Sequence, residues 1–310
     1  MEKFEQGTRY GKRGFKGEPL DPNTNLDGFE DLDVGCTKEI DTHGGISNGA
    51  PQATLNRKLS SLTEQVREFI TELKDKLHSK IIMMKSNLNK KLFNKASELN
   101  LEEMKVLVEK GADIFSLDEY DESLLGVVVK IENAEECIIY LLDNGFDINS
   151  QENYLSRTVL IIACSYSNPN NVGLLLKEGA DPNLVDENGD SALTQAAAIG
   201  CLECIKLLIS YGVNINEIRQ GRTPLMVALY NQNDNLEMVN FLLENGADIN
   251  AEGGYGTALW TAISYENLDM VKFLINKGAK IEGIKNIQNE TTLDFAERVG
   301  NKEIIEYLKS

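Results

Sequence analysis

Residues 191–212 read SALTQAAAIGCLECIKLLISYG, and they form one unit of a repeat that extends over most of this 310-residue chain. In this unit an apolar stretch that begins near Leu193 is followed by a second one that ends at Gly212. Equivalent glycines recur at intervals of 34, 34, 33, 34 and 32 residues, at Gly111, Gly145, Gly179, Gly212, Gly246 and Gly278. A fixed period of this length is typical of stacked repeats.

Each unit is predicted to hold two antiparallel helices and an extended arm. A leucine that opens the first helix precedes most of the glycines by nineteen residues, as at Leu92, Leu160, Leu193 and Leu259. The glycine supplies the left-handed backbone conformation that ends the second helix. Apolar pairs such as Leu207-Leu208 find no cover within one unit, so neighbouring units must bury them by stacking.

The units resemble those of the ankyrin-repeat family. The family opening TPLH-x-A-A is similar to TPLMVAL at 223–229, TALWTAI at 257–263, SALTQAA at 191–197 and TTLDFAE at 291–297. Its second helix is similar to GCLECIKLLI at 200–209. The resemblance covers about seven units over residues 90–310, the first and last degenerate. No unit keeps the histidine of TPLH, whose position holds Phe93, Ile161, Thr194, Met226, Trp260 and Asp294, so its usual hydrogen bond with threonine must be absent or replaced.

The predicted fold is therefore an all-α ankyrin-repeat solenoid of helix-turn-helix units with β-hairpin-like arms, preceded by a long amphipathic helix and a flexible N-terminal segment. We divide the chain into a flexible or disordered head (1–53), a basic amphipathic helix (54–89) and the repeats (90–310). In the helix, apolar residues recur at steps of four and three: Leu55, Leu59, Leu62, Val66, Phe69, Leu73 and Leu77, then Ile81, Met84 and Leu88. This stripe favours a cap on the first repeat, and a coiled-coil homodimer through residues 55–77 or contact with an anionic membrane are the alternatives.

Charge is unequally distributed along the chain. The net charge of −18 divides into −17 on residues 88–310 and −1 on residues 1–87, whereas residues 54–95 carry +6. A surface with so many carboxylates repels phosphate, so we expect no nucleic acid on the repeats. The acidic arms instead predict a protein partner of basic character.

Nothing in the sequence predicts an enzyme, a metal site or a cofactor. The chain has two histidines, His43 and His78, and no nucleophile elbow or dinucleotide fingerprint. Its five cysteines are interpreted as free thiols of a reducing compartment. Cys201 and Cys204 have CxxC spacing, but Cys204 holds an apolar helix position that Met238 and Met270 hold in other units, which favours a structural role.

The candidate sites are therefore partner-binding residues. The resemblance implies that the first helices and arm tips line a concave binding face. Large side chains expected there are Tyr166, Tyr230, Tyr265 and Trp260 on first helices, and Tyr120, Tyr154, Arg219, Arg222 and Tyr255 on arms. Tyr, Trp and Arg are the residue types most often found at binding hot spots.

The predicted function is non-catalytic binding of a protein partner by the repeats. The alternative is an adaptor whose first 88 residues recruit an enzyme or complex to a bound target. No Sec signal peptide and no apolar run long enough to span a membrane are visible, which predicts a cytoplasmic protein. The composition also resembles that of ankyrin-rich effectors delivered into the cytosol or nucleus of a host cell.

Overall fold

The computed structural model describes residues 51–153, 155–230, 235–254, 256–283 and 289–310, with side chains from residue 57 onward. Within these residues it has fourteen α-helices and one two-stranded antiparallel hairpin. The chain divides into two compact units, Met1–Lys80 and Ile81–Ser310. None of the described helices is long and apolar enough to cross a bilayer.

The first helix, α1, spans Pro51–Ser97 without a break. It includes the predicted basic helix and continues through residue 90 into the first helix of the first repeat, where Leu92 and Ala96 are buried. The predicted boundary between helix and repeats therefore falls inside one continuous helix. The predicted head reaches into this helix by three residues, and the rest of the head lies outside the described residues.

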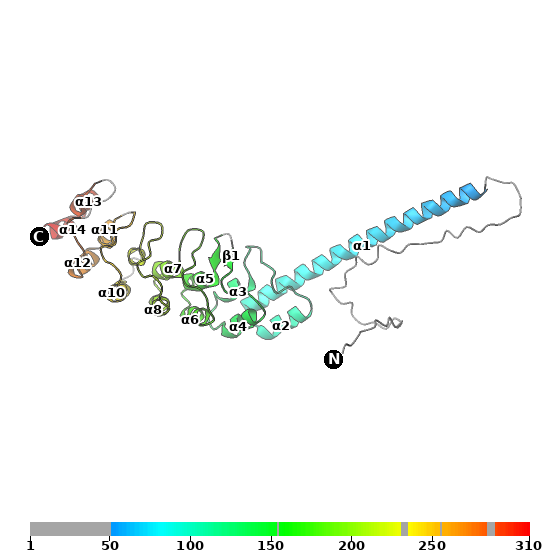
Figure 1. The fold of residues 1–310 in the computed structure, drawn as a ribbon, viewed down its shortest axis with the longest axis horizontal. Helices are drawn as coiled ribbons and strands as arrows, with labels where there is room; N and C mark the ends of the chain where they lie inside the picture. Colours follow the sequence, from blue (N-terminus) through cyan, green and yellow to red (C-terminus); the bar gives the residue numbers. More distant parts are fainter. Residues whose placement is uncertain (1–50, 154, 231–234, 255, 284–288) are drawn as a thin grey trace, which may run out of the picture. The chain divides into compact units, whose positions relative to one another are not determined.

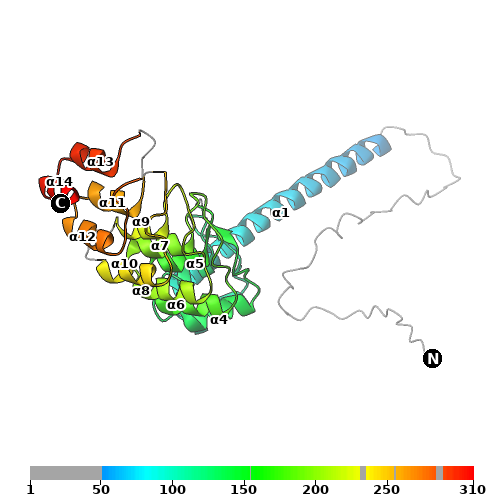
Figure 2. The ribbon, with the colours of Figure 1, turned by 60° about the vertical axis from the view of Figure 1, so that its left-hand side comes forward.

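The repeats form two rows of helices, with the arms beside the row of first helices (Figures 1 and 2). The first repeat ends with α2 (Leu101–Glu109). The following pairs are α3 (Leu124–Val128) and α4 (Glu135–Asp143), α5 (Val159–Ser165) and α6 (Pro169–Lys177), α7 (Ala192–Ile199) and α8 (Leu202–Ser210), α9 (Pro224–Ala228) and α10 (Leu236–Glu244), α11 (Ala258–Ser264) and α12 (Leu268–Asn276), and α13 (Thr292–Val299) and α14 (Lys302–Lys309). The seven units of the prediction are all present.

Local sequence explains where these helices begin and end. The hydroxyl oxygen of Thr223 accepts a hydrogen bond from the backbone N–H of Met226 at 3.2 Å, which caps the start of α9. Gly179 has a φ of 97°, a left-handed conformation that favours glycine after α6. Leucine, isoleucine and valine from both rows then form one continuous core between adjacent units.

The structure shows what replaces the missing histidine. In α7, Thr194 Oγ1 accepts from the backbone N–H of Ser191 at 2.8 Å, and in α13 the carboxylate of Asp294 does the same for Thr291 at 2.9 Å. In α11, Trp260 holds this position and bonds instead to the next unit. Thr194 and Asp294 thus stabilise the starts of their own helices by the same contact, whereas Trp260 connects two units.

The arms pair through few strand residues. In one arm, β1 (Gln151–Glu152) and β2 (Arg157–Thr158) form an antiparallel hairpin. Three further arms have a single antiparallel bridge, such as Arg219 with Arg222. Asparagine side chains connect successive arms: Asn149 Oδ1 accepts from the N–H of Asp181, and Asn216 Oδ1 from that of Asp248, at 2.8 and 2.7 Å.

The interpretation of the cysteines needs one correction. Cys204 is buried, as its repeat position predicts, and so are Cys137 and Cys164, which are free thiols. Cys201 and Cys204, however, form a disulfide within the first turn of α8. The CxxC spacing places Cys201 at the helix N-cap and Cys204 three residues later, so the two side chains meet on the same side of the helix start. Cys36 lies outside the described residues.

Candidate protein-binding surface

The ends of the first helices and the arms beside them form what we call the arm-side surface. Two clusters of predicted residues lie on it. The first cluster surrounds a hollow of about 270 Å³ lined by Tyr120, Glu122, Lys130, Asn153, Leu155, Arg157, Ile162 and Tyr166. Tyr120 and Tyr166 are 69% and 56% exposed, so both rings are available to a partner.

Lys130 organises the first cluster. Its ammonium lies 2.5 Å from Glu122 Oε2 and 5.4 Å from the ring centroid of Tyr166. The salt bridge and the cation–π contact hold the lysine against the tyrosine ring. Lys130 was not among the predicted site residues, although it follows Leu125 by five residues, as Tyr230 follows Leu225, and so shares the row of Tyr230.

A buried carboxylate supports this cluster from below. Glu152 accepts hydrogen bonds from Ser123 Oγ at 2.5 Å and from the Ser123 N–H at 3.3 Å. Burial raises the pKa of Glu152, an effect that the bonds from Ser123 oppose and the nearby charge of Glu122 reinforces. A Cβ at position 126 would collide with the Glu152 carboxylate, which is why Gly126 stands there. No spacing in the sequence distinguishes Glu152 from the exposed acidic residues of other arms.

The second cluster joins Arg222, Tyr230 and Tyr265. The rings of Tyr230 and Tyr265 meet edge to face, with centroids 5.5 Å apart. The guanidinium of Arg222 lies 5.4 Å from the centroid of Tyr230. Tyr265 is 42% exposed, and the other two are half-buried. Three residues chosen from sequence therefore form one contiguous patch across two units.

The neighbouring Arg219 is held differently. Its Nε donates to Glu217 Oε2 at 3.1 Å, and Glu217 also accepts from the hydroxyl of Ser191. Arg219 is thus part of an ion pair at the base of the arm. Among the described residues Arg222 has no carboxylate at ion-pair distance, which leaves its charge available beside the tyrosines.

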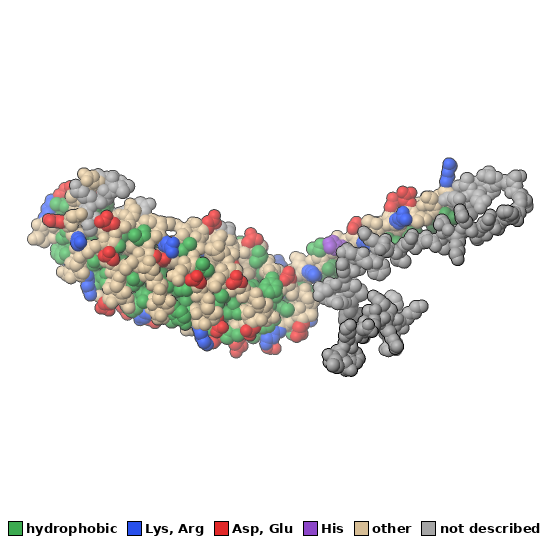
Figure 3. All heavy atoms as spheres, in the orientation of Figure 1, with side chains coloured by type: hydrophobic (Ala, Val, Ile, Leu, Met, Phe, Trp, Pro, Cys, Tyr) green, Lys and Arg blue, Asp and Glu red, His purple; other side chains and the backbone are tan. Residues whose placement is uncertain are grey.

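Two acidic residues of the arms, Asp186 and Glu122, turn inward. The Asp186 side chain is fully buried and accepts from Arg157 Nε at 3.2 Å, and Glu122 is buried against Lys130. Burial and the charge of Asp186 raise the pKa of the adjacent Asp190. The positive charges of Arg222 and Arg157 lower this pKa and so oppose part of the shift. Glu119, Asp121 and Glu187 are among the exposed acidic residues of the arms. Figure 3 shows acidic side chains spread over the displayed face of the repeats.

Trp260 does not belong to this surface, and its prediction as an exposed binding residue was wrong. It is 1% exposed, stacks on Phe295 with centroids 4.7 Å apart, and donates from Nε1 to Thr292 Oγ1 at 3.0 Å. The physical reason is that α13 supplies both an aromatic face and a hydroxyl acceptor opposite the indole. Tyr154 and Tyr255 lie outside the described residues.

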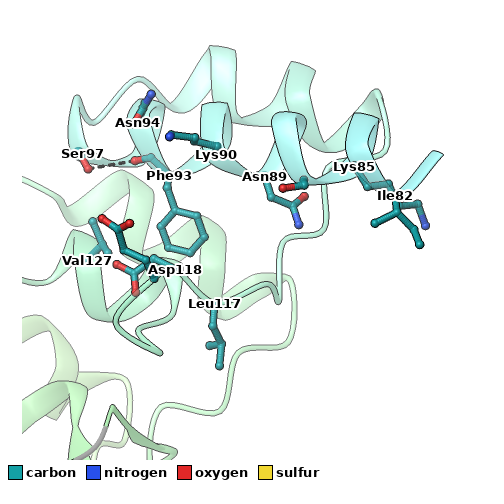
Figure 4. Close-up of a pocket in the computed structure, with 12 residues that line it drawn as sticks. Ile82, Lys85, Asn89, Lys90, Phe93, Asn94, Ser97, Leu117, Asp118 and Val127 are labelled. Carbon is teal, nitrogen blue, oxygen red and sulfur yellow. Dashed lines mark hydrogen bonds between the residues drawn. The ribbon is translucent and has the colours of Figure 1, made fainter. Parts of the chain in front are cut away.

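A larger hollow of about 660 Å³ lies at the start of the repeats, between the last turns of α1 and the first arm (Figure 4). Ile82, Lys85 and Phe93 contribute to one wall, and Leu117 and Asp118 to the other. Asp118 Oδ1 accepts from the N–H groups of Tyr120 and Glu122 at 2.8 and 3.0 Å, which fixes the arm. Sequence reasoning missed this hollow because it depends on α1 continuing into the first repeat. Within the described residues no group of histidines, cysteines or carboxylates is placed to hold a metal ion.

The chain belongs to the ankyrin-repeat family. The family model described as ankyrin repeats (3 copies) matches residues 92–186, 160–253 and 252–310. Proteins built from these repeats are generally non-catalytic modules of protein–protein interaction.

Curated relatives include human transient receptor potential cation channel subfamily A member 1 and the mouse B-cell lymphoma 3 protein homolog. Each is 32% identical over 159 residues, and the matches cover 48% and 49% of this chain. They cover 14% and 34% of the relatives, so the chain spans a minor part of either protein.

Among solved structures, the ankyrin repeat domain of Bcl-3, a member of the IkappaB protein family, matches with a TM-score of 0.59 and 25% identity. The ankyrin repeat domain of human ASB11 matches with a TM-score of 0.61 and 26% identity. Each comparison covers 71% of this chain and 97% of the other.

Proposed function

We propose that this protein is a non-catalytic scaffold that binds a protein partner on the concave, arm-side surface of its repeats. The observation that supports the proposal is the convergence of aromatic and basic side chains, three of them exposed and three half-buried, into two patches. One patch joins Tyr120, Lys130 and Tyr166, and the other joins Arg222, Tyr230 and Tyr265. Tyrosine and arginine bury a large contact area with few rotatable bonds, which suits them to anchor a partner.

The test is capture of partners by the full chain and by a variant with Tyr166→Ala, Tyr230→Ala and Tyr265→Ala. A matched control is Tyr211→Ala, because Tyr211 is 49% exposed but follows the second helix α8. We expect the triple variant to lose partners that the parent and the Tyr211 variant retain. Unchanged capture by the triple variant would reject the proposal.

The exposed carboxylates Glu119, Asp121 and Glu187 favour a partner of basic character. Opposite charges chiefly accelerate association, so the association rate should fall as salt is added while the dissociation rate changes little. Stopped-flow association with the captured partner at two salt concentrations measures this. A rate that rises with salt would favour an acidic partner.

The biological setting that we propose is action as an effector inside a host cell, in the cytosol or nucleus. What supports it is the combination of ankyrin units with frequent Asn, Ile and Lys. The alternative is an adaptor whose residues 1–88 recruit an enzyme to the repeat-bound target. If residues 90–310 alone reproduce the cellular effect, the adaptor is excluded.

A homodimer through residues 55–77 is a second candidate, supported by the heptad spacing from Leu55 to Leu73. Sedimentation velocity of the full chain separates a monomer from a dimer. If residues 55–77 form the seam, Leu62→Ser should shift the dimer towards monomer.

A further inference from the structure

Helix α1 has an apolar stripe along residues 59–77 that none of the described residues covers. The stripe consists of Leu59, Leu62, Val66, Ile70, Leu73 and Leu77, which are 58%, 62%, 50%, 47%, 50% and 57% exposed. Its members repeat every eleven residues: 59 with 70, 62 with 73 and 66 with 77. The heptad row of a left-handed coiled coil would use Phe69 in place of Ile70 and would share the other residues from Leu59 to Leu73.

The charges of α1 are arranged around this stripe. On a helix, side chains three or four residues apart are neighbours. Between residues 57 and 80, five of the six basic residues stand at such a distance from a stripe residue: Lys58, Arg67, Lys74, Lys76 and Lys80. None of the four acidic residues does (Glu64, Glu68, Glu72 and Asp75), although Glu72 stands three residues from Phe69, which is 60% exposed at one edge of the stripe. The helix therefore has an apolar centre, basic margins on both sides and an acidic back.

Most lysines at the basic margins have no ion-pair partner within the described part of α1. Lys76 pairs with Glu72 at 2.6 Å, but Lys58, Lys74 and Lys80 have no carboxylate partner among the described residues. The hydroxyls of Thr63 and Thr71 donate to the carbonyls of Leu59 and Arg67 in their own helix, at 2.7 and 2.9 Å. A binding partner of this face therefore meets the apolar stripe and unpaired ammonium groups.

We propose that this face of α1, residues 58–80, binds in the plane of an anionic lipid surface. Stripe side chains would enter the boundary between headgroups and acyl chains, while lysine stems extend sideways and place their ammonium groups at the phosphates. Each lysine near an anionic surface strengthens binding by about fivefold. The inference concerns α1 and does not depend on the partner proposed for the repeats.

A second copy of the chain fits this face less well. Residues eleven apart form a row along the helix. If two α1 helices packed in parallel, the row Lys58, Phe69 and Lys80 of one copy would lie beside the row Thr63 and Lys74 of the other. Antiparallel helices would place each row beside itself. In this eleven-residue register neither arrangement offers a carboxylate to the lysines, whereas coiled coils pair opposite charges at these margins. An acidic groove of another protein would also satisfy the charge, but it predicts no binding to anionic vesicles, so vesicle flotation separates it from a lipid surface.

The experiment is flotation of the full chain with vesicles of phosphatidylcholine alone and of phosphatidylcholine with about one third phosphatidylserine. We expect binding to the anionic vesicles and little to the neutral ones, with loss of binding as salt is raised. Binding to neither kind of vesicle, or equally to both, would overturn the proposal. So would a stable dimer in sedimentation velocity that Leu62→Ser with Leu73→Ser dissociates.

Two matched charge reversals identify the face. Lys74→Glu removes a margin lysine, and Arg57→Glu makes the same charge change at the one basic residue of 57–80 that has no stripe neighbour. We expect Lys74→Glu to weaken vesicle binding by about tenfold or more, and Arg57→Glu by a few-fold at most. Equal effects of the two variants would contradict a defined binding face. Far-UV circular dichroism verifies that both variants keep their helix content.

Discussion

The buried carboxyl of Glu152 makes the stability of the fold around the first arm-side cluster depend on pH. Burial raises its pKa above the ordinary glutamate value, so the folded state holds this proton more tightly than the unfolded chain. Stability from this group is therefore greatest at low pH and is lost as pH rises from about 4.3 to the raised pKa. Above that window the folded protein carries a buried charge next to Glu122.

We predict that Glu152→Gln removes this pH dependence. A glutamine amide can accept from the Ser123 N–H and donate to its hydroxyl, so both contacts persist. The free energy of unfolding of the parent should fall relative to the variant between pH 4 and neutrality. Urea unfolding at several pH values measures the difference. Parallel pH profiles of the two proteins would show that Glu152 titrates as in the unfolded chain.

Two equivalent threonines provide a second test at this scale. Thr223 Oγ1 caps α9, whereas Thr257 Oγ1, at the same position before α11, is buried and has no hydrogen-bond partner. Thr223→Val should cost about 1 kcal/mol, because it removes a cap. Thr257→Val should be neutral or stabilising by up to about 1 kcal/mol, because it removes an unsatisfied hydroxyl. Thermal unfolding of both variants gives the sign of each stability change. A clear loss of stability in Thr257→Val would mean that the Thr257 hydroxyl has a hydrogen-bond partner in solution.

At the scale of elements, the repeat period predicted the seven units because glycines and leucines recur within each unit. What it could not predict depends on contacts between units. Trp260 was expected at the surface because its position faces the arms, and it is buried because Phe295 and Thr292 stand opposite. Likewise Tyr230 and Tyr265 were chosen singly, and only the stacking of α9 on α11 shows that their rings touch.

The terminal pair α13 and α14 should therefore protect the only tryptophan of the chain. Deleting residues 291–310 removes the ring of Phe295 and the acceptor Thr292, and it exposes the indole to water. We predict a red shift of the tryptophan emission and a lower melting temperature, since end units cover apolar surface. The matched control is the point variant Tyr307→Ala in α14, which leaves both contacts of Trp260 in place. Unchanged emission after the deletion would mean that Trp260 is covered by another element.

At the scale of the whole molecule, the charge of the repeats sets a limit on stability. Residues 88–310 carry a net charge of −17, and several carboxylates in them are already buried, among them Glu122, Glu152 and Asp186. Like charges at this density repel one another in the folded state more than in the expanded unfolded chain. Added salt screens this repulsion over distances beyond about 10 Å, while the buried pairs Glu122–Lys130 and Asp186–Arg157 are screened much less.

We therefore predict that the repeats melt at a higher temperature in about 0.5 M NaCl than in about 0.02 M NaCl. The gain should shrink in a variant with Glu119→Gln, Asp121→Asn and Glu187→Gln, because these exposed arm residues contribute repulsion without pairing. A variant that neutralises Glu203 is the control, since Glu203 pairs with Lys206 at 2.7 Å and its loss should leave the salt effect almost unchanged. Differential scanning calorimetry of residues 81–310 measures all three. A melting temperature that falls with salt would mean that attractive ion pairs outweigh the net repulsion, and the acidic surface would then be a source of stability.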